Sequence, residues 1–149
     1  YLITTMQLIT NLNFKGNCEE AFKFYATALQ GELSEFSRYS QMPADPAMPL
    51  PANIANQIMH VSISKNGTMI LMGADMMPGF SPEYVIGTNM EVCIMTDNKS
   101  EADRIFNALG DGGSIAMPME DQFWGDYFGS VNDKYNVSWM ILCPGKQQS

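Results

Sequence analysis

The sequence predicts an α+β protein in which one strand–helix–three-strand module is used twice. The first observation is an internal repeat: Asn17–Tyr25 aligns with Asn98–Phe106, and each copy starts with Asn followed by Glu three residues later. This is typical of a capped helix start. Gly31 and Gly110 follow the two helical patterns, where a left-handed residue commonly ends a helix. The second observation is that alternating polar and apolar segments, typical of half-buried strands, flank both helices.

The first module is predicted to cover about residues 1–75. Its first strand is expected at Leu8–Lys15, directly before the first helix. After the helix, Ile58–Lys65 and Thr68–Gly73 are predicted to form a hairpin. Asn66-Gly67 between them favours the positive φ angles that a two-residue hairpin turn requires.

The second module is predicted to cover about residues 89–149, with a first strand at Asn89–Thr96. Three strands are expected after its helix, at Ser114–Met119, Tyr127–Val131 and Val137–Cys143. A linker rich in Pro and Gly, residues 76–88, joins the modules into a single domain of 1–149. The proline-rich stretch Gln41–Gln57 has no periodicity and is expected to be a long mobile loop, either a lid or a dimer contact.

Composition excludes several classes of function. Apolar residues make up 46% of 149 residues and charged residues 16%, which favours a folded globular chain. The net charge of −8 opposes binding to nucleic acid, and no apolar run is long enough to span a membrane. Three widely spaced cysteines and no recognisable signal peptide favour a cytoplasmic protein.

Strand alternation indicates which side chains face away from the two helices. In the predicted strands, apolar residues such as Val61 and Ile63 fall on one face and polar residues on the other. If the apolar faces contact the helices, the polar faces line a common cavity. Its predicted lining residues are Asn11, Asn13, His60, Asn89, Glu91 and Cys93.

Several of these residues carry groups that catalyse reactions. His60 is the only imidazole, and is either a general base or a structural histidine. Glu91 is either its catalytic partner or a structural acid, and Cys93 is either a nucleophile or an inert thiol. Phe123-Trp124 forms an aromatic wall for a flat ligand, a core plug or a dimer-interface anchor. Three further acids are interpreted as turn residues: Asp75, Asp126 and Asp133.

Seven segments, in order along nearly the whole chain, resemble the PhnB-like branch of the glyoxalase/bleomycin-resistance/dioxygenase superfamily. The segments are Asn11–Tyr25, Met59-His60, Leu71–Asp75, Glu101–Leu109, Met117–Met119, Phe123–Gly125 and Ser138–Met140. The superfamily is also called vicinal oxygen chelate, and this branch carries the description 3-demethylubiquinone-9 3-methyltransferase. The resemblance implies paired βαβββ modules that form an open, curved, mixed-sheet barrel, commonly in a homodimer.

The same resemblance bears on cofactors. Active members of the superfamily hold a divalent metal with His, Glu or similar ligands from strands of both modules. The corresponding positions here are Ile9 or Thr10, Leu71 or Met72, Asn89 or Met90, and Met140. None of these side chains is a good ligand for a hard or borderline cation. We therefore expect no metal at these positions and no other cofactor.

Three hypotheses of function follow. In the first, the chain binds an unknown small molecule in the barrel cleft without a metal, through Asn11, Asn13, Asn89, Cys93, Phe123, Trp124 and Met140. In the second, it is a metal-independent enzyme that uses His60 and Glu91. In the third, its dimer interface is the functional surface and side chains fill the cleft.

Overall fold

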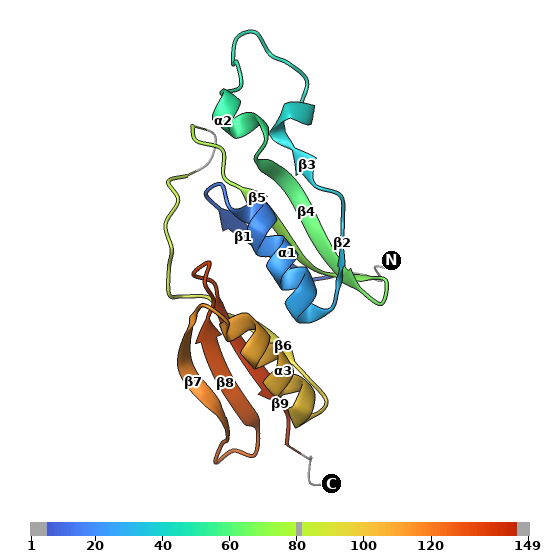
Figure 1. The fold of residues 1–149 in the computed structure, drawn as a ribbon, viewed down its shortest axis with the longest axis vertical. Coiled ribbons are helices and arrows are strands. Elements are labelled where there is room, and N and C mark those ends of the chain that lie inside the picture. Colours follow the sequence, from blue (N-terminus) through green and yellow to red (C-terminus); the bar gives the residue numbers. More distant parts are fainter. Residues whose placement is uncertain (1–5, 80–81, 146–149) are drawn as a thin grey trace. The chain divides into compact units, whose positions relative to one another are not determined.

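The computed structural model describes residues 6–79 and 82–145. The chain divides into two compact units, Tyr1–Val85 and Ile86–Ser149, and each contains one mixed sheet and one long helix (Figure 1). The predicted α+β class is therefore confirmed. Within these residues, no helix has the length and hydropathy needed to cross a membrane.

Unit 1 holds a five-stranded sheet in the order β1-β5-β4-β2, with β3 also paired to β4. Its elements are β1 (Thr10–Phe14), α1 (Cys18–Leu29), β2 (Glu32–Leu33), β3 (Ser37–Arg38), the 3₁₀ helix η1 (Tyr39–Gln41), α2 (Ala52–Ala55), β4 (Ile58–Lys65) and β5 (Thr68–Asp75). β1 runs parallel to β5, whereas β4 and β5 form the predicted antiparallel hairpin, with positive φ at Asn66 and Gly67. α1 lies across one face of this sheet (Figure 1).

The core of unit 1 forms between α1 and the sheet. Phe22 and Tyr25 of α1 are fully buried, and their rings contact the ring of Phe14 in β1. Gly73 of β5 faces the same helix, because a Cβ atom at this position would lie 2.2 Å from the Phe22 ring. The lack of a side chain at Gly73 thus allows α1 to approach the sheet closely.

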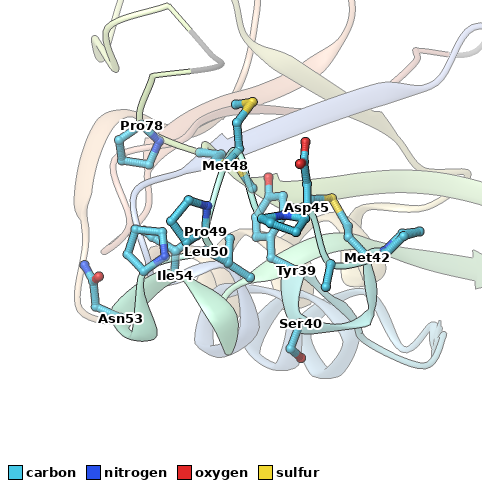
Figure 2. Close-up of a pocket in the computed structure, with 15 residues that line it drawn as sticks. Tyr39, Ser40, Met42, Asp45, Met48, Pro49, Leu50, Asn53, Ile54 and Pro78 are labelled. Atoms are coloured by element: carbon cyan, nitrogen blue, oxygen red, sulfur yellow. The ribbon is translucent and has the colours of Figure 1, made fainter.

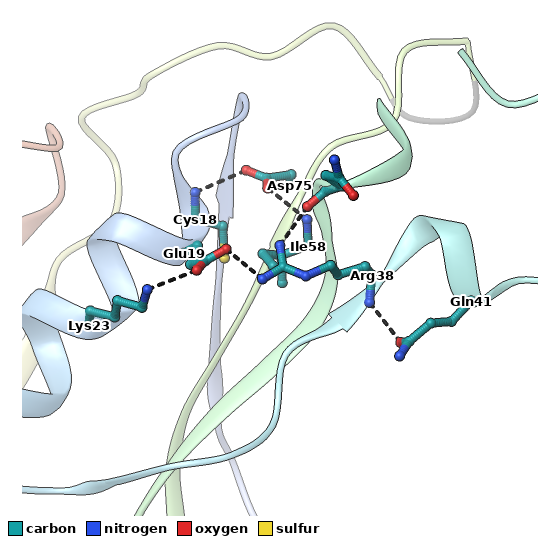
Figure 3. A network of polar contacts seen from close by, with 8 residues as sticks. Cys18, Glu19, Lys23, Arg38, Gln41, Ile58 and Asp75 are labelled. Carbon is teal, nitrogen blue, oxygen red and sulfur yellow. Dashed lines mark hydrogen bonds and ion pairs between the residues drawn. The ribbon is translucent and has the colours of Figure 1, made fainter. Parts of the chain in front are cut away.

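The start of α1 differs from the predicted capped helix start. Asn17 makes no capping hydrogen bond with its side chain. Instead, Asp75 at the end of β5 accepts hydrogen bonds at Oδ1 from Cys18 N (3.0 Å) and at Oδ2 from Ile58 N (2.9 Å) (Figure 3). Its Oδ1 also accepts a hydrogen bond from Gly16 N at 2.8 Å. The interpretation of Asp75 as a turn residue is therefore wrong: its carboxylate is buried and joins the starts of α1 and β4.

The end of α1 also differs from the pattern in the sequence. The left-handed residue is Gln30, with φ of 53°, rather than Gly31. Gly31 is needed for another reason, because a Cβ atom there would lie 2.5 Å from Ile63 Cγ2. Close packing against β4 therefore explains this glycine.

Unit 2 has a βαβββ order and a four-stranded mixed sheet, β6-β9-β8-β7. Its elements are β6 (Val92–Met95), α3 (Lys99–Gly110), β7 (Ser114–Asp121), β8 (Tyr127–Asn132) and β9 (Ser138–Cys143). The side chain of Asn98 caps α3 as predicted, accepting a hydrogen bond from Glu101 N at 2.8 Å. Leu109 of α3 and Trp139 and Ile141 of β9 are buried in the core.

Several boundaries differ from the predicted ones. β1 and β6 are shorter than expected, so that Asn89 and Glu91 precede β6 rather than belonging to it. The two-residue strands β2 and β3 are too short to produce a periodic signal, and the sequence did not reveal them. The stretch 41–57 contains the short helix α2, which Ile54 anchors as a buried residue.

Candidate functional site

Three of the predicted site residues lie on one face of the unit 1 sheet. Asn11 and Asn13 of β1 pair with Met72 and Ala74 of β5, on the face opposite α1. His60 shares this face, since it alternates with the buried, helix-facing Val61 on β4. All three side chains are exposed, and Asn11 Nδ2 donates a hydrogen bond to Asn13 Oδ1 at 3.1 Å. We call this surface the polar face.

His60 is an accessible imidazole rather than a buried structural one. Its side chain is exposed, and it makes no hydrogen bond within the part of the chain that the structure describes. On the neighbouring strand β3, the residue that pairs with His60 is Ser37. The His60 side chain is thus accessible to a ligand or to solvent.

Unit 2 presents a different surface on the sheet face opposite α3. Cys93 of β6 pairs with Met140 of β9, which in turn pairs with Ser130 of β8. Asn89 and Glu91 are exposed and lie in the segment that leads into β6. This face combines a thiol and a thioether, whereas the unit 1 face carries amides and an imidazole.

Cys93 does not have the electrostatic surroundings of an activated nucleophile. Partial burial raises the pKa of the Cys93 thiol, and the negative charge of Glu91 raises it further. A catalytic cysteine needs the opposite effect, because the thiolate is the reactive form. The surroundings of Cys93 therefore favour a binding or packing role.

We expect alkylation of Cys93 by iodoacetamide to be slower at pH 8 than alkylation of a free cysteine peptide. The raised pKa keeps a larger fraction of the thiol protonated, so the rate should increase with pH up to a more alkaline midpoint. Glu91→Gln should raise the rate at pH 8 by roughly two-fold, since it removes one nearby exposed charge. Peptide mass spectrometry separates Cys93 from the buried Cys18 and Cys143.

Glu120→Gln is the matched control for this experiment, because it removes an exposed carboxylate from β7, on the opposite edge of the same sheet. The control should leave the rate unchanged. An alkylation midpoint below that of the free peptide would contradict the assigned electrostatics.

Phe123 and Trp124 lie in the turn between β7 and β8. Their rings meet edge to face, with centroids 5.0 Å apart, and Trp124 Nε1 donates a hydrogen bond to Asp126 Oδ2 at 2.9 Å. Phe123 is 98% exposed and Trp124 is 51% exposed. The interpretation of these rings as a plug of the unit 2 core is therefore wrong, whereas an aromatic wall and an interface anchor both stay predictions.

The residues at the superfamily's metal-ligand positions do not fit a divalent cation. Thr10 pairs with Leu71, Met72 is the next residue of β5, and Met140 belongs to β9, so these positions offer hydroxyl, aliphatic and thioether groups. Within residues 6–79 and 82–145, no three His, Cys, Asp or Glu side chains gather closely enough to hold a metal ion.

A pocket of about 1280 Å³ lies in unit 1, apart from all of the predicted site residues. Residues 39–54 form most of its lining, and Met77 and Pro78, which follow β5, complete it (Figure 2). The sequence signal was the density of Pro and Met in the stretch 41–57, which we interpreted only as a lid or a dimer contact. We call this feature the loop pocket.

Comparison with known proteins identifies the family. The family model described as 3-demethylubiquinone-9 3-methyltransferase matches residues 6–142. Protein YjdN of Escherichia coli (strain K12) is 31% identical over 142 residues, which cover 91% of this chain and 94% of YjdN.

Solved structures agree with this match. The structure of PA1353 from Pseudomonas aeruginosa is 34% identical with a TM-score of 0.80, and the match covers 95% of this chain and 100% of that one. The PhnB protein from Bacillus cereus is 27% identical with a TM-score of 0.70, covering 93% and 99%. A glyoxalase/bleomycin resistance protein/dioxygenase family enzyme from Burkholderia phytofirmans, 11% identical, shares the fold with a TM-score of 0.59 over 89% and 94% of the chains. The chain therefore belongs to the family described as 3-demethylubiquinone-9 3-methyltransferase, is similar to the PhnB protein, and shares its fold with the glyoxalase/bleomycin resistance protein/dioxygenase family enzyme.

Proposed function

We propose that this protein binds a small organic molecule, without a metal, on the sheet face of unit 1 opposite α1. The observation that carries the proposal is the polar face of unit 1, where Asn11, Asn13 and His60 are exposed together. An amide can both donate and accept hydrogen bonds, and an imidazole can do either. The polar face therefore suits a ligand with uncharged oxygen and nitrogen groups.

In unit 2, taken by itself, the predicted ligand-binding residues form a separate and less polar set. Cys93 and Met140 offer polarizable sulfur atoms on the sheet face, and Phe123 and Trp124 offer exposed rings. Asn89 is the remaining proposed hydrogen-bonding residue. These five residues stay predictions that depend on the ligand experiment below.

Fragment binding followed by ¹H–¹³C NMR of labelled methionine methyl groups tests the proposal. The probes are fragment-sized compounds that carry an amide or a hydroxyl group. Met72 reports on the polar face, because it pairs with Asn11, and Met140 reports on unit 2. We expect some of the probes to shift the Met72 methyl signal.

The double variant Asn11→Ala/Asn13→Ala should weaken this binding about ten-fold. It removes two hydrogen bonds to the ligand of about 1 kcal/mol each, and water compensates for part of that loss. Asn107→Ala is the matched control, since Asn107 is an exposed amide on α3. Equal binding by the double variant and the wild type, or no effect of any probe on Met72, would overturn the proposal.

Metal independence has its own measurement. We expect elemental analysis of the purified protein to find zinc, nickel and iron far below one equivalent, because the ligand positions carry Leu, Met, Thr and Asn side chains. Treatment with a chelator should leave fragment binding unchanged. A stoichiometric metal whose removal abolishes binding would contradict this part of the proposal.

The accessibility of His60 supports a second candidate, a metal-independent enzyme that uses His60 as a general base. His60 belongs to unit 1 and Glu91 belongs to unit 2. His60→Gln separates the two candidates: it should abolish turnover by an enzyme, whereas a binding protein should lose at most one hydrogen bond to its ligand.

A further inference from the structure

We propose that the loop pocket is a second binding site, for an apolar small molecule that is either neutral or positively charged. This site goes beyond the proposed function, because none of the residues that line it belongs to the polar face or to the predicted set of site residues. All of its lining residues belong to unit 1.

The loop pocket has a fixed floor and an adaptable rim. Ile54 of α2 and Met77 after β5 are buried, with exposed fractions of 5% and 8%. Met42 and Met48 on the rim are 41% and 48% exposed (Figure 2). A thioether side chain adjusts to ligands of different shapes because it is unbranched and polarizable. The arrangement therefore suits an apolar ligand held between buried floor residues and exposed methionines.

The backbone on both sides of the loop pocket is tied to the rest of unit 1. Tyr39 donates a hydrogen bond from its hydroxyl to the Asp75 carbonyl oxygen at 2.6 Å, which ties η1 to the end of β5. Arg38 forms an ion pair with Glu19 of α1 (2.8 Å) and donates a hydrogen bond to the Asn56 carbonyl oxygen (2.7 Å) (Figure 3). Five of the lining residues are prolines, which restrict the backbone further. A wall held in this way loses little entropy when a ligand binds.

The charge of the lining determines which ligands fit. Among the described residues that line the loop pocket, none is Lys, Arg or His, and Asp45 is the only carboxylic acid. Asp45 is held in place because its Oδ1 accepts a hydrogen bond from Ala47 N at 2.9 Å and its carbonyl oxygen accepts one from Met48 N at 3.0 Å. An anionic ligand would face this carboxylate without a compensating cation, whereas a cationic ligand would be attracted. The volume of about 1280 Å³ is sufficient for a molecule of drug-like size.

Three probes of nearly equal shape and different charge test this inference: naphthylmethylammonium, naphthylmethanol and naphthoate. Methionine-methyl NMR of the full chain follows their binding, and single Met→Leu variants assign the signals. We expect the ammonium and the alcohol to shift the methyl signals of Met42, Met48 and Met77. Naphthoate should bind several-fold more weakly than the ammonium.

Asp45→Asn tests the charge preference. It should weaken ammonium binding by roughly two- to five-fold, which is the range expected for an exposed ion pair, and leave binding of the alcohol unchanged. Met48→Asp should weaken binding of the alcohol, whereas Leu8→Asp, on an exposed apolar residue outside the loop pocket, should not. Circular dichroism of each variant confirms that it folds.

Several results would overturn the inference. One is that no probe shifts the methyl signals of Met42, Met48 and Met77. Another is that naphthoate binds more tightly than the ammonium. A third is that the methyl signals shift with protein concentration, which would mean that a second copy of the chain covers the loop pocket. The methyl signal of Met72 serves as an internal reference, because it responds to the polar face. A failure at the loop pocket is thereby distinguished from a failure of the proposed function.

Discussion

Asp75→Ala is expected to lower the free energy of unfolding of unit 1 by about 4 kcal/mol, because the substitution leaves buried N–H groups without acceptors. The Asp75 side chain is 1% exposed and accepts hydrogen bonds from three backbone amides: Gly16, Cys18 and Ile58. Asp75→Asn should be nearly as destabilising, since its amide group would direct a donor at one of these N–H groups.

Chemical denaturation followed by circular dichroism measures this loss. Both tryptophans, Trp124 and Trp139, belong to unit 2, so their fluorescence monitors that unit separately. Hydrogen exchange of the Cys18 and Ile58 amides should accelerate in the Asp75 variants. Asp45→Ala is the control, because Asp45 is exposed and makes only a local turn contact. A loss below about 1 kcal/mol for Asp75→Ala would show that water replaces the carboxylate.

Asp133→Ala is expected to lower the free energy of unfolding of unit 2 by about 3 kcal/mol or more. Asp133 is also nearly fully buried, and its Oδ1 accepts hydrogen bonds from Tyr135 N (2.7 Å) and Val137 N (3.1 Å). Its Oδ2 accepts a hydrogen bond from Trp139 Nε1 at 2.7 Å. The substitution therefore removes the support of both the β8–β9 turn and the largest side chain of the core.

Tryptophan fluorescence during denaturation reports this change directly, because Trp139 loses its hydrogen-bond partner and its fixed surroundings. Asp97→Ala provides the matched control in unit 2, since Asp97 is exposed. We expect the control to change the free energy of unfolding by less than about 0.5 kcal/mol, as is usual for surface positions. An equal effect of the two substitutions would contradict the structural role of Asp133.

Asp75 and Asp133 illustrate which hydrogen-bond partners a local sequence pattern can predict. The interpretation as a turn residue holds for Asp133, because the three hydrogen-bond donors named above lie two, four and six residues away. It fails for Asp75, whose partners lie 17 to 59 positions away. A local pattern carries no information about partners so distant in the chain, and only the packing of β5 against α1 and β4 reveals them.

The same distinction applies to the candidate site, where the sequence placed some residues correctly and not others. Strand periodicity was sufficient to place Asn11, Asn13 and His60 on one face, because the side chains of a regular strand alternate. It was not sufficient for Asn89 and Glu91, which precede β6. The loop pocket was missed because an aperiodic, proline-rich stretch does not indicate whether its residues enclose a volume.

The sequence by itself determined the two strand–helix–strand units and the Asn66-Gly67 hairpin. These features depend on local periodicity and turn geometry, which follow from residues close together in the sequence. The tertiary structure alone decided that Asp75 caps α1, that Gly31 and Gly73 permit close packing, and that residues 39–54 enclose a pocket with Met77 and Pro78. Each of these depends on the distance between segments far apart in the chain, which is fixed only when the core is packed.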